Sequence, residues 1–213
     1  MVALLIAGTA AGASTGVLAL APILAMAFPL IAATWFLHRE GITWRRLGFA
    51  RAMPLGRFVG LSLGGAAGIV LIVNFALTPL LRSLGAPPID LAPLAEVIQG
   101  DTTNYLLFLV PVAWGSAAFG EELLLRGFVL HRLSLVAGVG WGVVLQAVLF
   151  SLGHAYQGVT GMITLFVVGV LFGYLYLRAG RNLWPVIAAH GLIDTISLTL
   201  LYLGYADTVS PGG

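Results

Sequence analysis

Two adjacent carboxylates and an arginine interrupt an apolar stretch near the middle of the chain, in the segment Glu121-Glu122-Leu-Leu-Leu-Arg126. The chain of 213 residues is 60% hydrophobic and only 8% charged, so these charges stand out. An ionised side chain deep in a bilayer costs at least a few kcal/mol, and such residues usually pair, face the protein interior and mark a working site. We therefore expect the chemistry of the protein to lie here.

The spacing of the three side chains predicts a division of roles. Residues four apart share a helical face, so Glu122 and Arg126 can form an ion pair, while Glu121 points about 100° away. One carboxylate is then held and the other is left free, and a desolvated free carboxylate can act as a general base for water. A purely structural charge network between helices is the alternative interpretation of the same residues.

Two further polar sites have the same spacing, Phe150 with His154 and His190 with Asp194. Each spacing places its two residues on one helical face. A single histidine in a membrane helix more often makes a hydrogen bond between helices than takes part in catalysis. The occurrence of both pairs beside the two glutamates favours a shared site.

Long tracts without any charge indicate the fold class. Asp, Glu, Lys and Arg are absent from residues 1–37, 58–81, 102–120 and 133–177. A spanning helix needs about 20 apolar residues, and lipid cannot satisfy the open backbone of a sheet. We predict an all-α, polytopic helical membrane protein, a single integral-membrane domain over residues 1–213, with about six to seven transmembrane helices and the site in the core of the bundle.

The predicted spans lie near residues 17–37, 58–81, 104–132, 139–157, 160–177 and 183–203. A helix over all of the first 37 residues would be about 55 Å long, well beyond a hydrocarbon core of about 30 Å, so we expect a break at residues 12–16 or at Pro22.

The ten basic residues are all arginines and gather in a few connections, most densely between Arg39 and Arg57. The positive-inside rule predicts that loop 38–57 is cytoplasmic in a multi-pass protein of the cell membrane. A net charge of +2 is too small to indicate a nucleic-acid partner. The absence of cysteine excludes a disulfide framework and a thiol nucleophile.

Depth in the membrane gives a geometric test of a shared site. With a turn near Gly138, Glu121 lies about 17 residues before the turn and His154 about 16 after it, or roughly 25 Å along each helix, so the two can face each other across a hairpin. His190 lies only about nine residues beyond a turn at Gly180, or roughly 14 Å deep. His190 therefore fits the shared site less well by this count, and the sequence leaves open whether Pro185 tilts the helix or starts it late, or whether the site lies below the midpoint of the hairpin.

The motifs Glu-Glu-x-x-x-Arg (Glu121, Glu122, Arg126), Phe-x-x-x-His (Phe150, His154) and His-x-x-x-Asn/Asp (His190, Asp194) follow one another on successive hydrophobic segments. In this order they resemble the CAAX prenyl protease type II and bacteriocin-processing family of intramembrane proteases, also called CPBP or Abi. The resemblance covers a family-like catalytic core at about residues 105–205. The chain departs from the pattern at Leu125, where an aromatic residue is common, and at Asp194, where many members carry Asn.

The resemblance implies an intramembrane endopeptidase. Glu121, with His154, would activate a water, while His190 and Asp194 would orient the substrate carbonyl or stabilise the oxyanion; Glu122, Arg126 and Phe150 would support them. Because an ionised Asp cannot donate a hydrogen bond, the oxyanion role requires a protonated Asp194 or falls to His190 alone.

Members of this family have been described both as metalloproteases and as metal-free glutamate proteases. Two histidines and a glutamate are a plausible catalytic zinc set, although the chain has no His-Glu-x-x-His segment. We expect no required cofactor and keep zinc as the alternative.

Two other classes of function are consistent with the same residues. A proton-coupled carrier or channel could use the Glu, His and Asp side chains as a proton relay. A non-catalytic membrane immunity or scaffold protein could retain the motifs for stability. For the protease, the expected partners are a peptide or small membrane-protein substrate and the lipid bilayer; prenylation of the substrate and the oligomeric state are left open.

Overall fold

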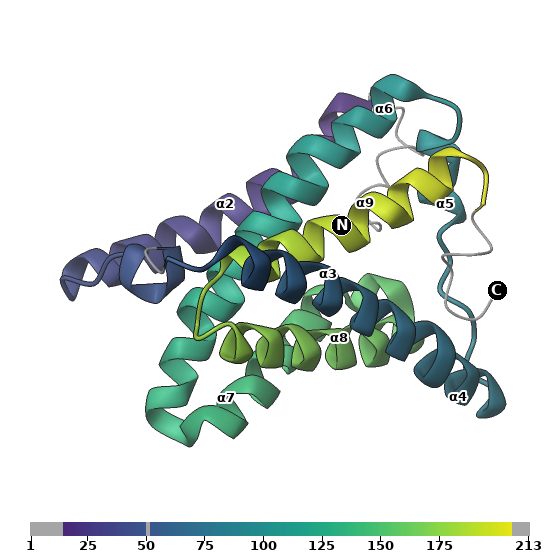
Figure 1. Ribbon diagram of the computed structural model, residues 1–213. Coiled ribbons are helices and arrows are strands. Elements are labelled where there is room, and N and C mark those ends of the chain that lie inside the picture. Colours follow the sequence, from purple (N-terminus) through teal and green to yellow (C-terminus); the bar gives the residue numbers. More distant parts are fainter. Residues whose placement is uncertain (1–14, 50–51, 206–213) are drawn as a thin grey trace.

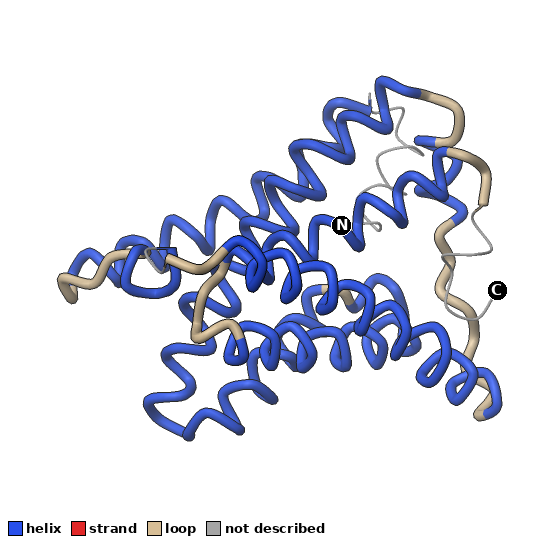
Figure 2. Tube along the Cα trace, in the orientation of Figure 1, coloured by secondary structure: helices blue, strands red, loops and turns tan. Residues whose placement is uncertain are grey.

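The computed structural model describes residues 15–49 and 52–205, and this part of the chain consists of helices and their connections, without a strand (Figure 2). The prediction of an all-α, polytopic helical protein is confirmed. Charge-free tracts of this length form helices because a helix satisfies its own backbone hydrogen bonds within the segment.

The helices follow one another as shown in Figure 1, where α denotes α-helices and η denotes π- or 3-10 helices. Their bounds are α2 Thr15–Arg39, η1 Arg45–Phe49, α3 Leu55–Ile72, η2 Val73–Leu77, α4 Thr78–Ser83, α5 Ala92–Ile98, α6 Thr102–Leu107, η3 Phe108–Val129, α7 Leu130–Gly153, η4 Ala155–Gln157, α8 Gly158–Arg178 and α9 Trp184–Tyr202.

Five helical segments in the described residues are long and apolar enough to cross a membrane: Ala19–Arg39, Leu55–Ser83, Thr102–Gly153, Ala155–Arg178 and Trp184–Tyr202. A straight helix of the 52 residues in Thr102–Gly153 would be about 78 Å long, more than twice the core of a bilayer. The chain instead turns at Gly138 (φ 82°, ψ 162°), and Figure 1 shows α7 sharply bent. This segment is therefore folded into two helical parts, one on each side of that glycine, where two spans were predicted.

The first described helix corrects one expectation. Helix α2 runs without interruption through Pro22 and Pro29, so Pro22 does not break it, and residues 12–14 lie outside the described residues. Proline is tolerated in a membrane helix where neighbouring helices satisfy the freed backbone groups. In addition, the hydroxyl of Ser116 on η3 donates a hydrogen bond to the carbonyl of Pro22, at 3.0 Å, and so links η3 to this part of α2.

Helices α7 and α8 pack closely because glycines face α7. A Cβ atom at Gly169 would lie 3.0 Å from the Ala147 Cα atom, and one at Gly173 would lie 3.1 Å from the Val143 side chain. Small residues at this spacing let helix backbones approach in membrane proteins. The close approach brings the backbone of α8 within reach of buried polar side chains on its neighbours.

Candidate active site

Glu122 and Arg126 lie on η3 and are both fully buried. The expected ion pair is present, with 2.9 Å between Arg126 Nη1 and Glu122 Oε1. The guanidinium also donates through Nη2 to the carbonyl of Gly169 on α8, at 3.2 Å. Its carbon lies 4.9 Å from the ring centre of Phe150 and 5.2 Å from that of Phe172, so two aromatic faces enclose the charge.

His190 binds the same carboxylate from helix α9. Its Nδ1 atom lies 2.8 Å from Glu122 Oε1, the oxygen that also accepts from Arg126. Its ring stacks on Phe172, with the ring centres 4.8 Å apart. On the other side of the imidazole, Nε2 lies 3.6 Å from Oδ2 of Asp194, one helical turn further along α9. His190 thus bridges a fixed buried carboxylate and a second, partly exposed one.

Glu121 and His154 form the more accessible half of the cluster. His154 Nε2 lies 4.0 Å from Glu121 Oε1, and the side chains are 19% and 16% exposed. His154 Nδ1 lies 2.9 Å from the backbone carbonyl of Phe150. Because a carbonyl oxygen can only accept a hydrogen bond, Nδ1 carries the proton and donates it. When the imidazole is neutral, its other nitrogen, Nε2, therefore has a free lone pair, and this nitrogen is the one near Glu121. The second oxygen of Glu121 is buried without a hydrogen-bond partner among the described residues.

The structure brings all four predicted catalytic residues, Glu121, His154, His190 and Asp194, into one cluster with the three supporting residues. The depth of His190, which the residue counts left open, does not keep it from the cluster, since its Nδ1 atom lies 2.8 Å from Glu122. His190 follows the connection between α8 and α9, residues 179–183. That connection folds back on η1, where the Leu183 amide donates to the Gly48 carbonyl at 3.3 Å.

Sequence reasoning missed one buried polar member of the network. Gln146 on α7 is fully buried and donates through Nε2 to the carbonyl of Gly169 at 2.8 Å, beside Arg126. The sequence could have indicated this residue, because Gln146 is a polar amide inside the charge-free tract 133–177. A buried amide must find a hydrogen-bond partner. Gln146 and Arg126 together anchor the site to the backbone of α8.

The side chains do not fit the zinc set considered from sequence. In the described part of the chain, no three His, Asp or Glu residues are arranged to hold a metal ion. One nitrogen of His190 bonds Glu122 and the other faces Asp194, while Nδ1 of His154 bonds a backbone carbonyl. The Nε2 atoms of His154 and His190 are the ring nitrogens that make no hydrogen bond with these groups, so they are the ones that a metal would use.

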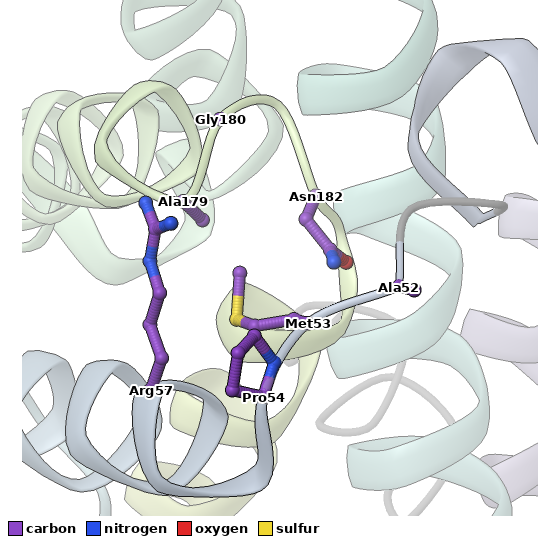
Figure 3. Close-up of a pocket in the computed structure, with 7 residues that line it drawn as sticks. All are labelled: Ala52, Met53, Pro54, Arg57, Ala179, Gly180 and Asn182. Atoms are coloured by element: carbon purple, nitrogen blue, oxygen red, sulfur yellow. The ribbon is translucent and has the colours of Figure 1, made fainter.

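A cavity of about 400 Å³ lies elsewhere, between the connections 52–57 and 179–182. Figure 3 shows Arg57, Met53 and Asn182 directed into the space between these connections. The Arg57 guanidinium donates to the backbone carbonyl of Arg178 at 3.2 Å. None of the predicted site residues lines this cavity, so it is separate from the carboxylate cluster.

Comparison with protein families gives one match. The family model described as type II CAAX prenyl endopeptidase Rce1-like matches residues 103–196, a range that contains every residue of the cluster. No curated protein and no solved structure matches the chain. The resemblance inferred from the three motifs is therefore confirmed over this range.

Proposed function

Because residues 103–196 belong to the type II CAAX prenyl endopeptidase family, we propose that this protein is an intramembrane endopeptidase that hydrolyses a peptide bond with a water activated by Glu121 and His154. The observation that carries the proposal is the pair itself: Glu121 Oε1 and His154 Nε2 lie 4.0 Å apart, partly exposed, in an apolar helical bundle. A separation of this size is too long for a direct hydrogen bond, yet both groups can contact one water molecule.

In the proposed reaction Glu121 takes a proton from the water while the water oxygen bonds to the carbonyl carbon. The π bond of the carbonyl opens and its oxygen becomes an oxyanion. When the tetrahedral intermediate collapses, the carbon–nitrogen bond breaks and the protonated Glu121 returns its proton to the leaving amine. His154 orients the water through the lone pair of Nε2, since its Nδ1 proton is committed to the Phe150 carbonyl.

The environments of the two glutamates support their different roles. Glu122 accepts from both Arg126 and His190, so its charge is compensated and its position is fixed. Glu121 has no arginine partner and lies next to the exposed part of the site. We assign Glu121 to the chemistry and Glu122 to the positioning of His190, which with Asp194 faces the substrate carbonyl.

We further propose that the reaction requires no metal, because Glu121 and His154 are placed to bind and activate one water between them. The substrate is a peptide or a small membrane protein that reaches the cluster at the bilayer. The arginines of loop 38–57 favour a cytoplasmic position for that loop.

The test is cleavage of a fluorogenic peptide library, including peptides with prenylated carboxyl-terminal cysteine motifs, by protein reconstituted in lipid nanodiscs. Wild type is compared with Glu121→Gln and His154→Ala, each with and without a strong chelator. Glu40→Gln is the matched control, because Glu40 is an exposed glutamate that pairs with Arg132 away from the cluster.

Cleavage that is lost in both site variants, retained in Glu40→Gln and unaffected by chelator supports the proposal. Loss on chelation with recovery on adding zinc contradicts the metal-free mechanism. Absence of cleavage by folded wild type in every lipid tested contradicts the protease itself and favours a carrier or a scaffold.

A further inference from the structure

Of the four residues assigned to catalysis, His190 is the one that can donate to the oxyanion. It donates its Nδ1 proton to Glu122, whose Oε1 atom is a carboxylate oxygen paired with Arg126. Its other nitrogen, Nε2, can donate when the imidazole, which lies between two carboxylates, is protonated. Oδ2 of Asp194 lies 3.6 Å from that nitrogen, and an ionised carboxylate accepts hydrogen bonds but cannot donate them. Asp194 therefore competes with the oxyanion for the His190 proton, and the proposed hydrolysis calls for a second donor from another residue.

Tyr156 lies at the required place. It belongs to η4, the single turn that follows His154 directly, and its ring centre lies 5.7 Å from that of His154. Its side chain is partly buried, as are those of Glu121 and His154. Tyr156 therefore lies beside His154, one of the two residues proposed to hold the water.

The hydroxyl of Tyr156 has an uncommitted proton. Its oxygen accepts a hydrogen bond from Gln157 Nε2 at 3.1 Å, while no acceptor for its own proton is found among the described residues. A phenol has one proton to donate. The donor is therefore available to a substrate.

Glycines hold the turn that presents this hydroxyl. Gly158 has a φ of 71° and ends η4, a conformation that side-chain-bearing residues rarely adopt. Gly161, on the first turn of α8, leaves room for Gln157, because a Cβ atom there would collide with the Gln157 side chain. Gln157 can then lie where its amide reaches the Tyr156 oxygen.

We propose that the Tyr156 hydroxyl donates a hydrogen bond to the carbonyl oxygen of the scissile peptide bond and to the oxyanion that forms from it. This inference rests on the proposed endopeptidase function. Tyr156 thereby takes the donor role that an Asn side chain would fill at position 194. Gln157 acts as a positioning residue that orients the phenol.

The experiment compares wild type with Tyr156→Phe, which removes only the hydroxyl. Loss of one oxyanion donor lowers kcat by about 100-fold or more, and we expect this loss with little change in KM. A peptide phosphinate, a tetrahedral mimic with an anionic oxygen, should bind Tyr156→Phe more weakly by a similar factor. Tyr174→Phe is the matched control, since Tyr174 lies on α8 with 59% of its surface exposed, and should behave as wild type.

Two further variants sharpen the result. Asp194→Asn introduces an amide donor, so it should raise the kcat of Tyr156→Phe when the two changes are combined. Gln157→Leu should lower kcat less than Tyr156→Phe does, with a parallel loss of phosphinate affinity, and it provides the test if Tyr156→Phe does not fold.

Wild-type kcat in Tyr156→Phe, or a lower kcat with unchanged phosphinate affinity, overturns the role of Tyr156. Both of these outcomes leave the endopeptidase proposal intact, provided that wild type cleaves the peptide and Glu121→Gln does not. Cleavage that persists in Glu121→Gln overturns the proposed mechanism together with this inference.

Discussion

His190 Nδ1 lies 2.8 Å from the Glu122 oxygen that also receives the Arg126 guanidinium at 2.9 Å. One carboxylate oxygen thus joins η3 and α9 at the centre of the bundle. Since Arg126 also donates to the Gly169 carbonyl, the linkage extends to α8. Three helices are therefore connected through Glu122, while Glu121, its neighbour in sequence, stays outside this linkage.

The two adjacent glutamates should respond differently to the same substitution. Glu121→Gln removes a general base and should lower kcat by about 100-fold or more, with stability near wild type, because Glu121 has no buried ion-pair partner. Glu122→Gln removes the partner of Arg126 and should mainly destabilise the fold. Cleavage assays and thermal unfolding in the same detergent measure both effects. Equal loss of stability in both variants would contradict the division of roles.

The buried ion pair should contribute far more to stability than an exposed one. Arg126→Met leaves Glu122 buried without its cation and should cost about 3–5 kcal/mol. Arg132→Met breaks a pair with Glu40 whose side chains are 27% and 44% exposed, and it should cost at most about 1 kcal/mol. Free energies of unfolding measured in mixed micelles provide the comparison. Similar costs in the two variants would mean that Arg126 is better solvated than the structure indicates.

The close packing of α8 on α7 should be sensitive to a single methyl group. Gly169→Ala places a Cβ atom 3.0 Å from the Ala147 backbone, and overpacking of this kind costs about 1–3 kcal/mol. It should also lower activity, because the Gly169 carbonyl anchors Arg126. Gly60→Ala on α3 is the control, with no atom within 4 Å of the added Cβ. A Gly169→Ala protein as stable and active as Gly60→Ala would refute the tight contact.

The corner of α7 should depend on glycine at one position only. Gly138 has φ 82° and ψ 162°, a region of backbone conformation that is essentially restricted to glycine, so Gly138→Ala should cost about 1–3 kcal/mol. Gly140→Ala, two residues away, has equal free space and no positive φ, and should be close to neutral. Thermal unfolding of the two variants tests this. Equal stability would show that the corner adapts to a side chain.

Much of the fold follows from local properties of the chain. The charge-free tracts predicted membrane helices, and Gly138 was predicted as a turn between two of them. The spacing of Glu122 and Arg126 predicted their ion pair, because one helical turn determines that distance whatever surrounds it. The assignment of Glu121, His154, His190 and Asp194 to catalysis stays a prediction, although their proximity agrees with it.

Relations between helices could not be obtained in the same way. Residue counts from Gly180 left open whether His190 reaches Glu121 and His154, because such counts assume that both turns end at the same depth. Pro22 was expected to interrupt a helix, but α2 runs through it and packs against η3, where the Ser116 hydroxyl, 94 residues further along the chain, bonds the Pro22 carbonyl. Each of these outcomes depends on a neighbour that is distant in sequence.

The amino-acid sequence by itself determined the membrane class, the corner at Gly138 and the pairing of Glu122 with Arg126, since hydrophobicity and helical periodicity act over one or two turns. The tertiary structure alone decided that His190 reaches Glu122 and that Gly169 accepts from Arg126 and Gln146. The physical reason is that such contacts depend on where helices cross and how closely glycines let them approach, which no local pattern encodes.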